Sequence, residues 1–260
     1  MNSLTKKGLL GLSVVTLFST FTLAEEIKSM GDAVNMAGKQ RMFTQRMLKD
    51  YAMVGMQNTF GNPSEDLINI MNEFHTNLGM LKKYTKSDET KKNLENVSTL
   101  WEPISKTLEA VPTKDAVGKL QEDLDLLLKA ADDATKSFAK ESGKASGEVV
   151  DMAGRQRMLS QKMASLYMLK VWGIEDPQFK VKLDEAMGLF KTSLAELEKS
   201  SLNTEEITAL LAKVKRSFMF FEMMGRSSSK FVPTLIYKKS NDILKNMNSA
   251  TQAYVALETK

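Results

Sequence analysis

Two short stretches of the chain repeat a pattern of arginine, glutamine and glycine that is suited to holding a small anion. Residues 36–47 read MAGKQRMFTQRM and residues 152–163 read MAGRQRMLSQKM, with eight of the twelve positions identical. Arg41 and Arg157 occupy the same place in the two copies. A guanidinium group is planar and presents paired N–H donors, so it fits a planar oxoanion or carboxylate better than lysine does. Arg41 and Arg157 are therefore the candidate ligand-binding residues; the alternative is that they are bridged to acidic residues elsewhere in the bundle.

A helix would place the motif residues on two separate faces. One face is a seam with spacings of four, three, four, three and four, formed by Val34, Gly38, Arg41, Gln45, Leu48 and Ala52, and in the second copy by Val150, Gly154, Arg157, Gln161, Ala164 and Met168. The other face carries large apolar residues such as Met36 and Phe43. A helix that is apolar on two sides needs two partners, one in its own bundle and one elsewhere.

We expect the two seams to face each other, because Gly38 and Gly154 would let two helix backbones approach closely. Gln45 and Gln161 would then pack on the seam or support a ligand. Arg41 and Arg157 would meet, and two like charges at close range repel unless an anion lies between them. Arg46 and Lys162 also recur; we expect them to be solvated basic side chains, with contact to the ligand's periphery as the alternative.

The repeat extends far beyond the motif. The same offset of 116 residues pairs Tyr51 with Tyr167 and Phe74 with Phe190, and late in each half it pairs Ala134 with Ala250. A full-length duplication into two units of ordinary domain size follows. We assign residues 25–141 to the first unit and 142–260 to the second.

Apolar residues recur at spacings of three and four within each unit, as in Leu67, Met71, Phe74, Leu78 and Leu81. This period predicts amphipathic helices, and no strand pattern competes with it. The predicted fold class is all-α, with two tandem antiparallel four-helix bundles that arose by internal duplication. The predicted helices span 27–57, 63–85, 88–110, 114–140, 145–172, 176–200, 203–226 and 232–257.

Local signals support these boundaries. Asn62-Pro63 and Asp176-Pro177 each place a capping residue before a proline, which favours a helix start. Ser87 and Thr113 are expected to cap the next two helices of the first unit. The apolar run of Phe218, Met219, Phe220, Phe221, Met223 and Met224 is predicted to be buried core, with an exposed partner groove as the alternative.

The junction between the units contains Gly143 and Gly147 among small polar residues. A turn here would place the second bundle beside the first, and this is the arrangement that we predict. A continuous helix would stack the bundles end to end, and glycine disfavours it by only about 1 kcal/mol.

Composition excludes several functional classes. The chain has no cysteine and a single histidine, His75, so thiol nucleophiles, Cys-ligated metals and two-His metal sites are absent. We therefore predict no enzyme, no catalytic residue, no metal and no cofactor. The 18 methionines are spread at core spacing rather than clustered as copper ligands would be. The net charge of +4 includes Lys6 and Lys7, so the remainder is nearly balanced and nucleic acid is not an expected partner.

The first 24 residues have the pattern of a secretory signal peptide. Lys6 and Lys7 precede an apolar stretch, residues 8–23, and Thr22 and Ala24 are the small residues of a cleavage site. Cleavage would release the protein into the periplasm. The alternative is an uncleaved segment that anchors the chain to the inner membrane.

The pattern AGxxRMxxxR/K, at residues 37–46 and 153–162, resembles the N-terminal sensor domains of the PilJ type and of NarX-like nitrate sensors. The resemblance covers both repeats and implies a four-helix bundle. In the nitrate sensors the motif arginine, here Arg41 and Arg157, binds nitrate between the first helices of two subunits. Gly38, Gln45, Gly154 and Gln161 would support that site.

The resemblance implies an exported, non-enzymatic sensory protein that recognises a small anion, nitrate-like, nitrite-like or a carboxylate, between its two repeats. Its expected partner is a membrane sensor kinase or a chemotaxis transducer. The alternative function is a structural or adaptor protein that uses the same seam to dock or to form a homodimer and binds no ligand. Pairing of the repeats within one chain or between chains is left open by the sequence.

Overall fold

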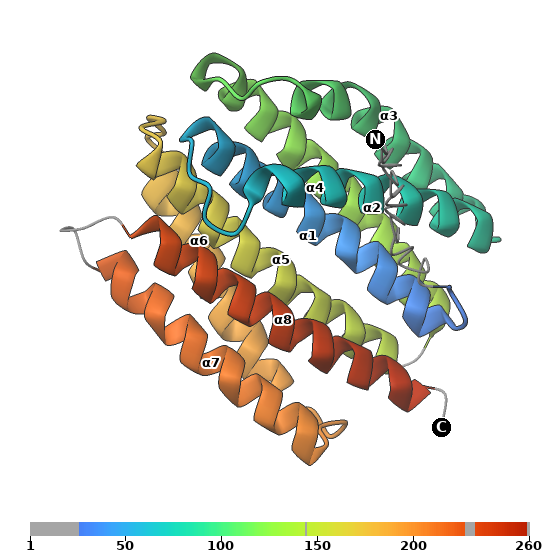
Figure 1. The fold of residues 1–260 in the computed structure, drawn as a ribbon. Coiled ribbons are helices and arrows are strands. Elements are labelled where there is room, and N and C mark those ends of the chain that lie inside the picture. The colour runs from blue at the N-terminus through green and yellow to red at the C-terminus, as the bar shows by residue number, and fades with distance from the viewer. Residues whose placement is uncertain (1–25, 144, 227–231, 259–260) are drawn as a thin grey trace, which may run out of the picture.

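The computed structural model describes residues 26–143, 145–226 and 232–258, and the expected signal peptide at 1–24 lies outside them. The described residues form eight α-helices and no strand, which confirms the all-α class (Figure 1). The helices are α1 (Met30–Gly55), α2 (Pro63–Tyr84), α3 (Asp88–Glu109), α4 (Lys114–Ser142), α5 (Ala145–Val171), α6 (Phe179–Leu197), α7 (Glu205–Arg226) and α8 (Pro233–Glu258). None of these helices is long and apolar enough to cross a bilayer.

The chain turns between its two halves, as predicted. Helix α4 ends at Ser142, and Gly143 follows with a φ of 60°, a left-handed conformation that glycine adopts without steric cost. Helix α5 then runs back along the first bundle, so the two four-helix bundles lie side by side (Figure 1).

Helices α1 and α5 lie at the centre of the molecule. Helix α1 packs against α2 and α4 in its own bundle and most extensively against α5, which in turn packs against α6 and α8. A single hydrophobic core therefore runs through both bundles. Phe74 and Phe190, which are equivalent in the two copies, are both fully buried in it. The repeats pair within one chain in this structure.

The helix starts follow the capping signals only in part. Ser87 and Thr113 cap α3 and α4 by accepting hydrogen bonds from the amides of Thr90 and Ala116. Pro63 begins α2, but Asn62 is left-handed and its side chain forms no capping bond. The start predicted at Asp176-Pro177 is wrong, because Asp176 accepts a bond from the Gln178 amide in a turn and α6 begins at Phe179.

Candidate functional site

The seam predicted from the motif is the contact between α1 and α5. Gly38 and Gly154 lie opposite each other where the two helices come together. A Cβ added to Gly38 would lie 3.9 Å from the Gly154 Cα, and one added to Gly154 would lie 3.9 Å from the Gly38 Cα. At that distance an added Cβ would make an ordinary contact with the opposite backbone. It would lie closer, at 3.1 to 3.4 Å, to the Nη2 atoms of Arg41 and Arg157, so the absence of a side chain leaves room for the two guanidinium groups.

Arg41 and Arg157 converge on this glycine contact. The Nη2 atoms of both arginines lie within 3.4 Å of the point where a Cβ of either glycine would be. Both side chains are buried, with 0% of Arg41 and 1% of Arg157 exposed. The structure thus brings together the two residues that the sequence singled out, from helices that lie 116 residues apart in the chain.

Two carboxylates hold Arg41. Its Nη1 donates to Oδ1 of Asp132 on α4 at 2.6 Å, and its Nη2 lies 2.7 Å from Oδ1 of Asp151 on α5. Partial burial raises the pKa of Asp132, but the charges of Arg41 and Lys136 outweigh it and hold this pKa below its ordinary value. The Nε of Arg41 is buried and has no hydrogen-bond partner.

Neutral groups take the equivalent places around Arg157. Its Nη1 donates to Oδ1 of Asn248 on α8 at 3.1 Å, and its Nη2 donates to the backbone carbonyl of Asn35 on α1 at 3.3 Å. Asn248 is the residue equivalent to Asp132, and Asn35 is equivalent to Asp151, at the same offset of 116 residues. The geometry of the two arginines is therefore nearly symmetric, whereas the charge at the equivalent positions around them is not.

The two carboxylates that hold Arg41 also bind other cations. Asp132 pairs with Lys136, and Asp151 pairs with Arg155. Both of these further cations are more exposed than Arg41, whereas the guanidinium groups of Arg41 and Arg157 are fully enclosed at the crossing.

The motif glutamines lie along the same seam and join the two bundles. Ser165 on α5 donates to Oε1 of Gln45 at 3.2 Å, and in the equivalent place Lys49 on α1 donates to Oε1 of Gln161 at 2.8 Å. These bonds lie between α1 and α5, so the glutamines join the helices rather than contact the guanidinium groups.

The other recurring basic residues are bound elsewhere. Arg46 forms two hydrogen bonds to Asp66 on α2, and Nζ of Lys162 lies 3.6 Å from Oδ1 of Asp125 on α4. Both side chains are partly buried and form ion pairs. Both side chains keep about a quarter of their surface exposed, so they are paired as well as partly solvated.

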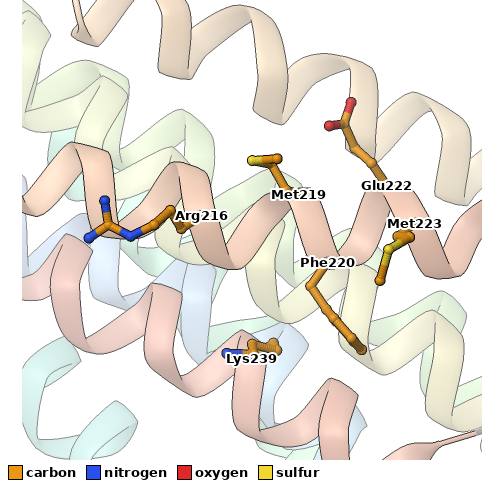
Figure 2. Close-up of a pocket in the computed structure, with 6 residues that line it drawn as sticks. All are labelled: Arg216, Met219, Phe220, Glu222, Met223 and Lys239. Atoms are coloured by element: carbon orange, nitrogen blue, oxygen red, sulfur yellow. The ribbon is translucent and has the colours of Figure 1, made fainter.

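The apolar run on α7 is only partly buried. Phe218 and Phe221 face the core, whereas 60% of Met219 and 63% of Met223 are exposed. With Phe220, Arg216, Glu222 and Lys239 they line an open groove of about 570 Å³ between α7 and α8 (Figure 2). The prediction that the whole run is core is wrong for these two methionines.

Sequence reasoning missed the residues that hold the arginines. Asp132 and Asn248 come from the last helix of each bundle, and Asp151 and Asn35 come from the opposite copy. The signal that could have found them is the 116-residue offset, which relates both pairs. Among the described residues, no group of three or more His, Cys, Asp or Glu side chains could hold a metal ion.

Comparison with protein families identifies one match. The model of the family described as PilJ, the N-terminal part of type IV pili methyl-accepting chemotaxis transducers, matches residues 22–132 and again residues 138–218. Each match contains one copy of the arginine motif, so the duplication is a tandem pair of the same domain. No curated protein and no solved structure matches the chain significantly.

Proposed function

The chain belongs to the PilJ family of chemotaxis transducer N-terminal domains, and on this premise we propose that it senses a small planar anion in the periplasm. The family has a sensory, non-enzymatic signalling role. The ligand and the location of this chain are our proposal. We place the ligand at the crossing of α1 and α5, between Arg41 and Arg157.

One observation carries the proposal: two buried guanidinium groups converge on a contact between two glycines. Asp132 and Asp151 already pair with Arg41, and an anion bound between the two guanidinium groups would add to the attraction that holds these like charges together. Each guanidinium is planar and offers paired donors, so nitrate, nitrite or a carboxylate fits better than a tetrahedral ion. The unpartnered Nε of Arg41 is a further donor for such a ligand.

Binding at this place would couple the ligand to helix packing. Arg41 reaches α4 and α5, and Arg157 reaches α8 and α1, so an anion that moves either guanidinium changes contacts in both bundles. A ligand shifts a conformational equilibrium only through such differential contacts. The partner that reads this change is a membrane sensor kinase or a chemotaxis transducer in our proposal.

A thermal-shift series tests the proposal on residues 25–260. Nitrate, nitrite, formate, acetate, sulfate and chloride are compared at matched ionic strength, so that general screening is constant. We expect one planar anion to raise the melting temperature of the wild type. Arg41→Lys and Arg157→Lys, which keep the charge but lose the planar fork, should lose that shift. Arg216→Ala, which removes an exposed arginine on α7, should keep it.

The affinity is also bounded. A four-atom ion at about −1.5 kcal/mol per atom reaches roughly −6 kcal/mol, so the Kd should not be tighter than tens of micromolar. Titration calorimetry measures it. An equal response of the wild type to all the ions would contradict the anion site and favour the structural or adaptor function.

A further inference from the structure

A second cluster of buried charges lies about two helical turns from Arg41 along α1. Lys49 and Asp50 are both fully buried, with 0% of either side chain exposed. Asp66 on α2 and Tyr237 on α8 adjoin them. The second copy has Ser165, Leu166 and Lys182 where the first has Lys49, Asp50 and Asp66, so this cluster does not follow from the duplication.

Lys49 is satisfied by groups of the second bundle. Its Nζ donates to Oε1 of Gln161 on α5 at 2.8 Å and to Oδ1 of Asn241 on α8 at 3.1 Å. The same Nζ lies 4.4 Å from the centre of the Tyr237 ring, a cation–π contact. Nζ is 3.7 Å from Oδ1 of Asp50, which is too long for a hydrogen bond. Lys49 thus binds the second bundle more closely than it binds its neighbour Asp50.

Asp50 has no hydrogen-bond donor. Both of its carboxylate oxygens are buried and neither accepts a hydrogen bond. A buried ionised carboxylate without donors is costly, whereas the protonated acid carries no charge and has a hydrogen to donate. The geometry therefore favours the neutral acid at position 50.

Asp66 is the neighbouring carboxylate that can accept that hydrogen. Arg46 donates two hydrogen bonds to Asp66, which favours its ionised form. Burial opposes this, but a hydrogen bond with Asp50 and the charge of Arg46 together lower the pKa of Asp66. Burial raises the pKa of Asp50 to about 8, and the negative charge of Asp66 adds to the rise. The carboxyl groups of Asp50 and Asp66 therefore hold one proton between them, and it is bound to Asp50.

We propose that Asp50 and Asp66 form a proton-binding site that makes the contact between the two bundles sensitive to pH. With the proton bound, Asp50 is neutral and Lys49 keeps its bonds to Gln161 and Asn241. When the proton leaves, the new negative charge on Asp50 competes for the Lys49 ammonium group and weakens those bonds to α5 and α8. This site is independent of the anion site at Arg41 and Arg157.

The groups around Asp50 set the direction of the pH effect. Arg46 and Lys49 on α1 stabilise the ionised form, and Asp66 on α2 opposes it. Tyr237 on α8 is neutral in this range, because burial and then the charge of Asp50 raise its pKa to about 12. From α5 the neutral amide of Gln161 faces Lys49. In the second copy, Lys162 on α5 is equivalent to Arg46, and it pairs with Asp125 on α4.

The folded protein therefore holds a proton that the unfolded chain releases near pH 4. Stability should fall as pH rises from about 4 to 8, and the loss stops above the folded pKa. A difference of one bound proton between the folded and unfolded states lowers the melting temperature by about 3 to 5 °C per pH unit for a protein of this size.

The test compares the full chain with Asp50→Asn, which imitates the neutral acid, and with Asp184→Asn, which removes an exposed carboxylate on α6. Melting temperatures are recorded from pH 5 to 8. We expect the wild type and Asp184→Asn to lose about 3 to 5 °C per pH unit relative to Asp50→Asn. Parallel profiles for the wild type and Asp50→Asn would refute the proton site.

Infrared spectroscopy of the wild type gives a second readout that does not depend on the variant folding. The C=O band of a protonated carboxyl group should be present at pH 6 and disappear with a midpoint near pH 8. Absence of this band at pH 6 would overturn the proposal.

Discussion

Replacing the carboxylate of Asp132 with an amide should lower stability substantially, because Asp132 forms an ion pair with Arg41. Asp132→Asn keeps the shape of the side chain but removes the charge that Nη1 of Arg41 contacts at 2.6 Å. Asn248 shows that an amide can occupy the equivalent place at 3.1 Å from Arg157, so the variant should fold. It makes the first copy resemble the second at this position.

The magnitude follows from burial. Arg41 is completely buried and Asp132 is about one quarter exposed, so solvent screens the pair only partly. A hydrogen bond between charged groups contributes about 1.5 to 3 kcal/mol, and Asp151 continues to neutralise Arg41 in the variant. We expect Asp132→Asn to lower the free energy of unfolding by about 2 kcal/mol and the melting temperature by about 4 to 8 °C.

The pH dependence separates this effect from a general loss of packing. The pKa of Asp132 lies below its ordinary value in the fold, so its contribution is present above pH 4 and is lost as pH falls through the folded pKa. Urea denaturation at pH 7 and at pH 3 measures the difference between the wild type and Asp132→Asn. The difference should be full at pH 7 and smaller at pH 3.

The neighbouring residue supplies the control. Asp133 pairs at 3.1 Å with Lys129, and both side chains are exposed, so Asp133→Asn should cost no more than about 0.5 kcal/mol. Equal losses for Asp132→Asn and Asp133→Asn would refute the conclusion that the Arg41 pair is special.

Two further predictions concern the same crossing. Gly154→Ala places a methyl group 3.1 Å from Nη2 of Arg41 and 3.2 Å from Nη2 of Arg157, so urea denaturation should show a loss of about 1 to 3 kcal/mol. Gly79→Ala on α2, where nothing lies within 4 Å, should instead gain up to about 1 kcal/mol, and a gain at Gly154 would contradict the close approach. Asn248→Asp puts a carboxylate beside Arg157 and should raise the melting temperature by a few degrees while weakening the anion-dependent shift. An undiminished shift in thermal-shift titrations would argue against an anion at Arg157.

The helices and their burial could be predicted from the sequence because they depend on local periodicity. Spacings of three and four along α1 identified Val34, Gly38 and Arg41 as one seam, and all three are buried. The offset of 116 residues identified α5 as its counterpart, and the two helices do pack together. The capping residues Ser87 and Thr113 act within one turn and were also predictable.

Tertiary structure alone decided what those buried groups contact. Asp132 meets Arg41 because α4 packs against α1 in one particular register, and no local pattern encodes the register of two helices 91 residues apart. The same holds for Lys49 and Asp50, which the sequence analysis did not single out and which are enclosed by α2, α5 and α8.

The exposed Met219 and Met223 show the opposite case. Apolar residue type predicted burial, but no neighbouring helix covers their face of α7 in the described residues. Residue type and spacing thus determine which face of a helix is apolar. The helices that pack around it determine whether an apolar face is covered and whether a charge finds its counterion.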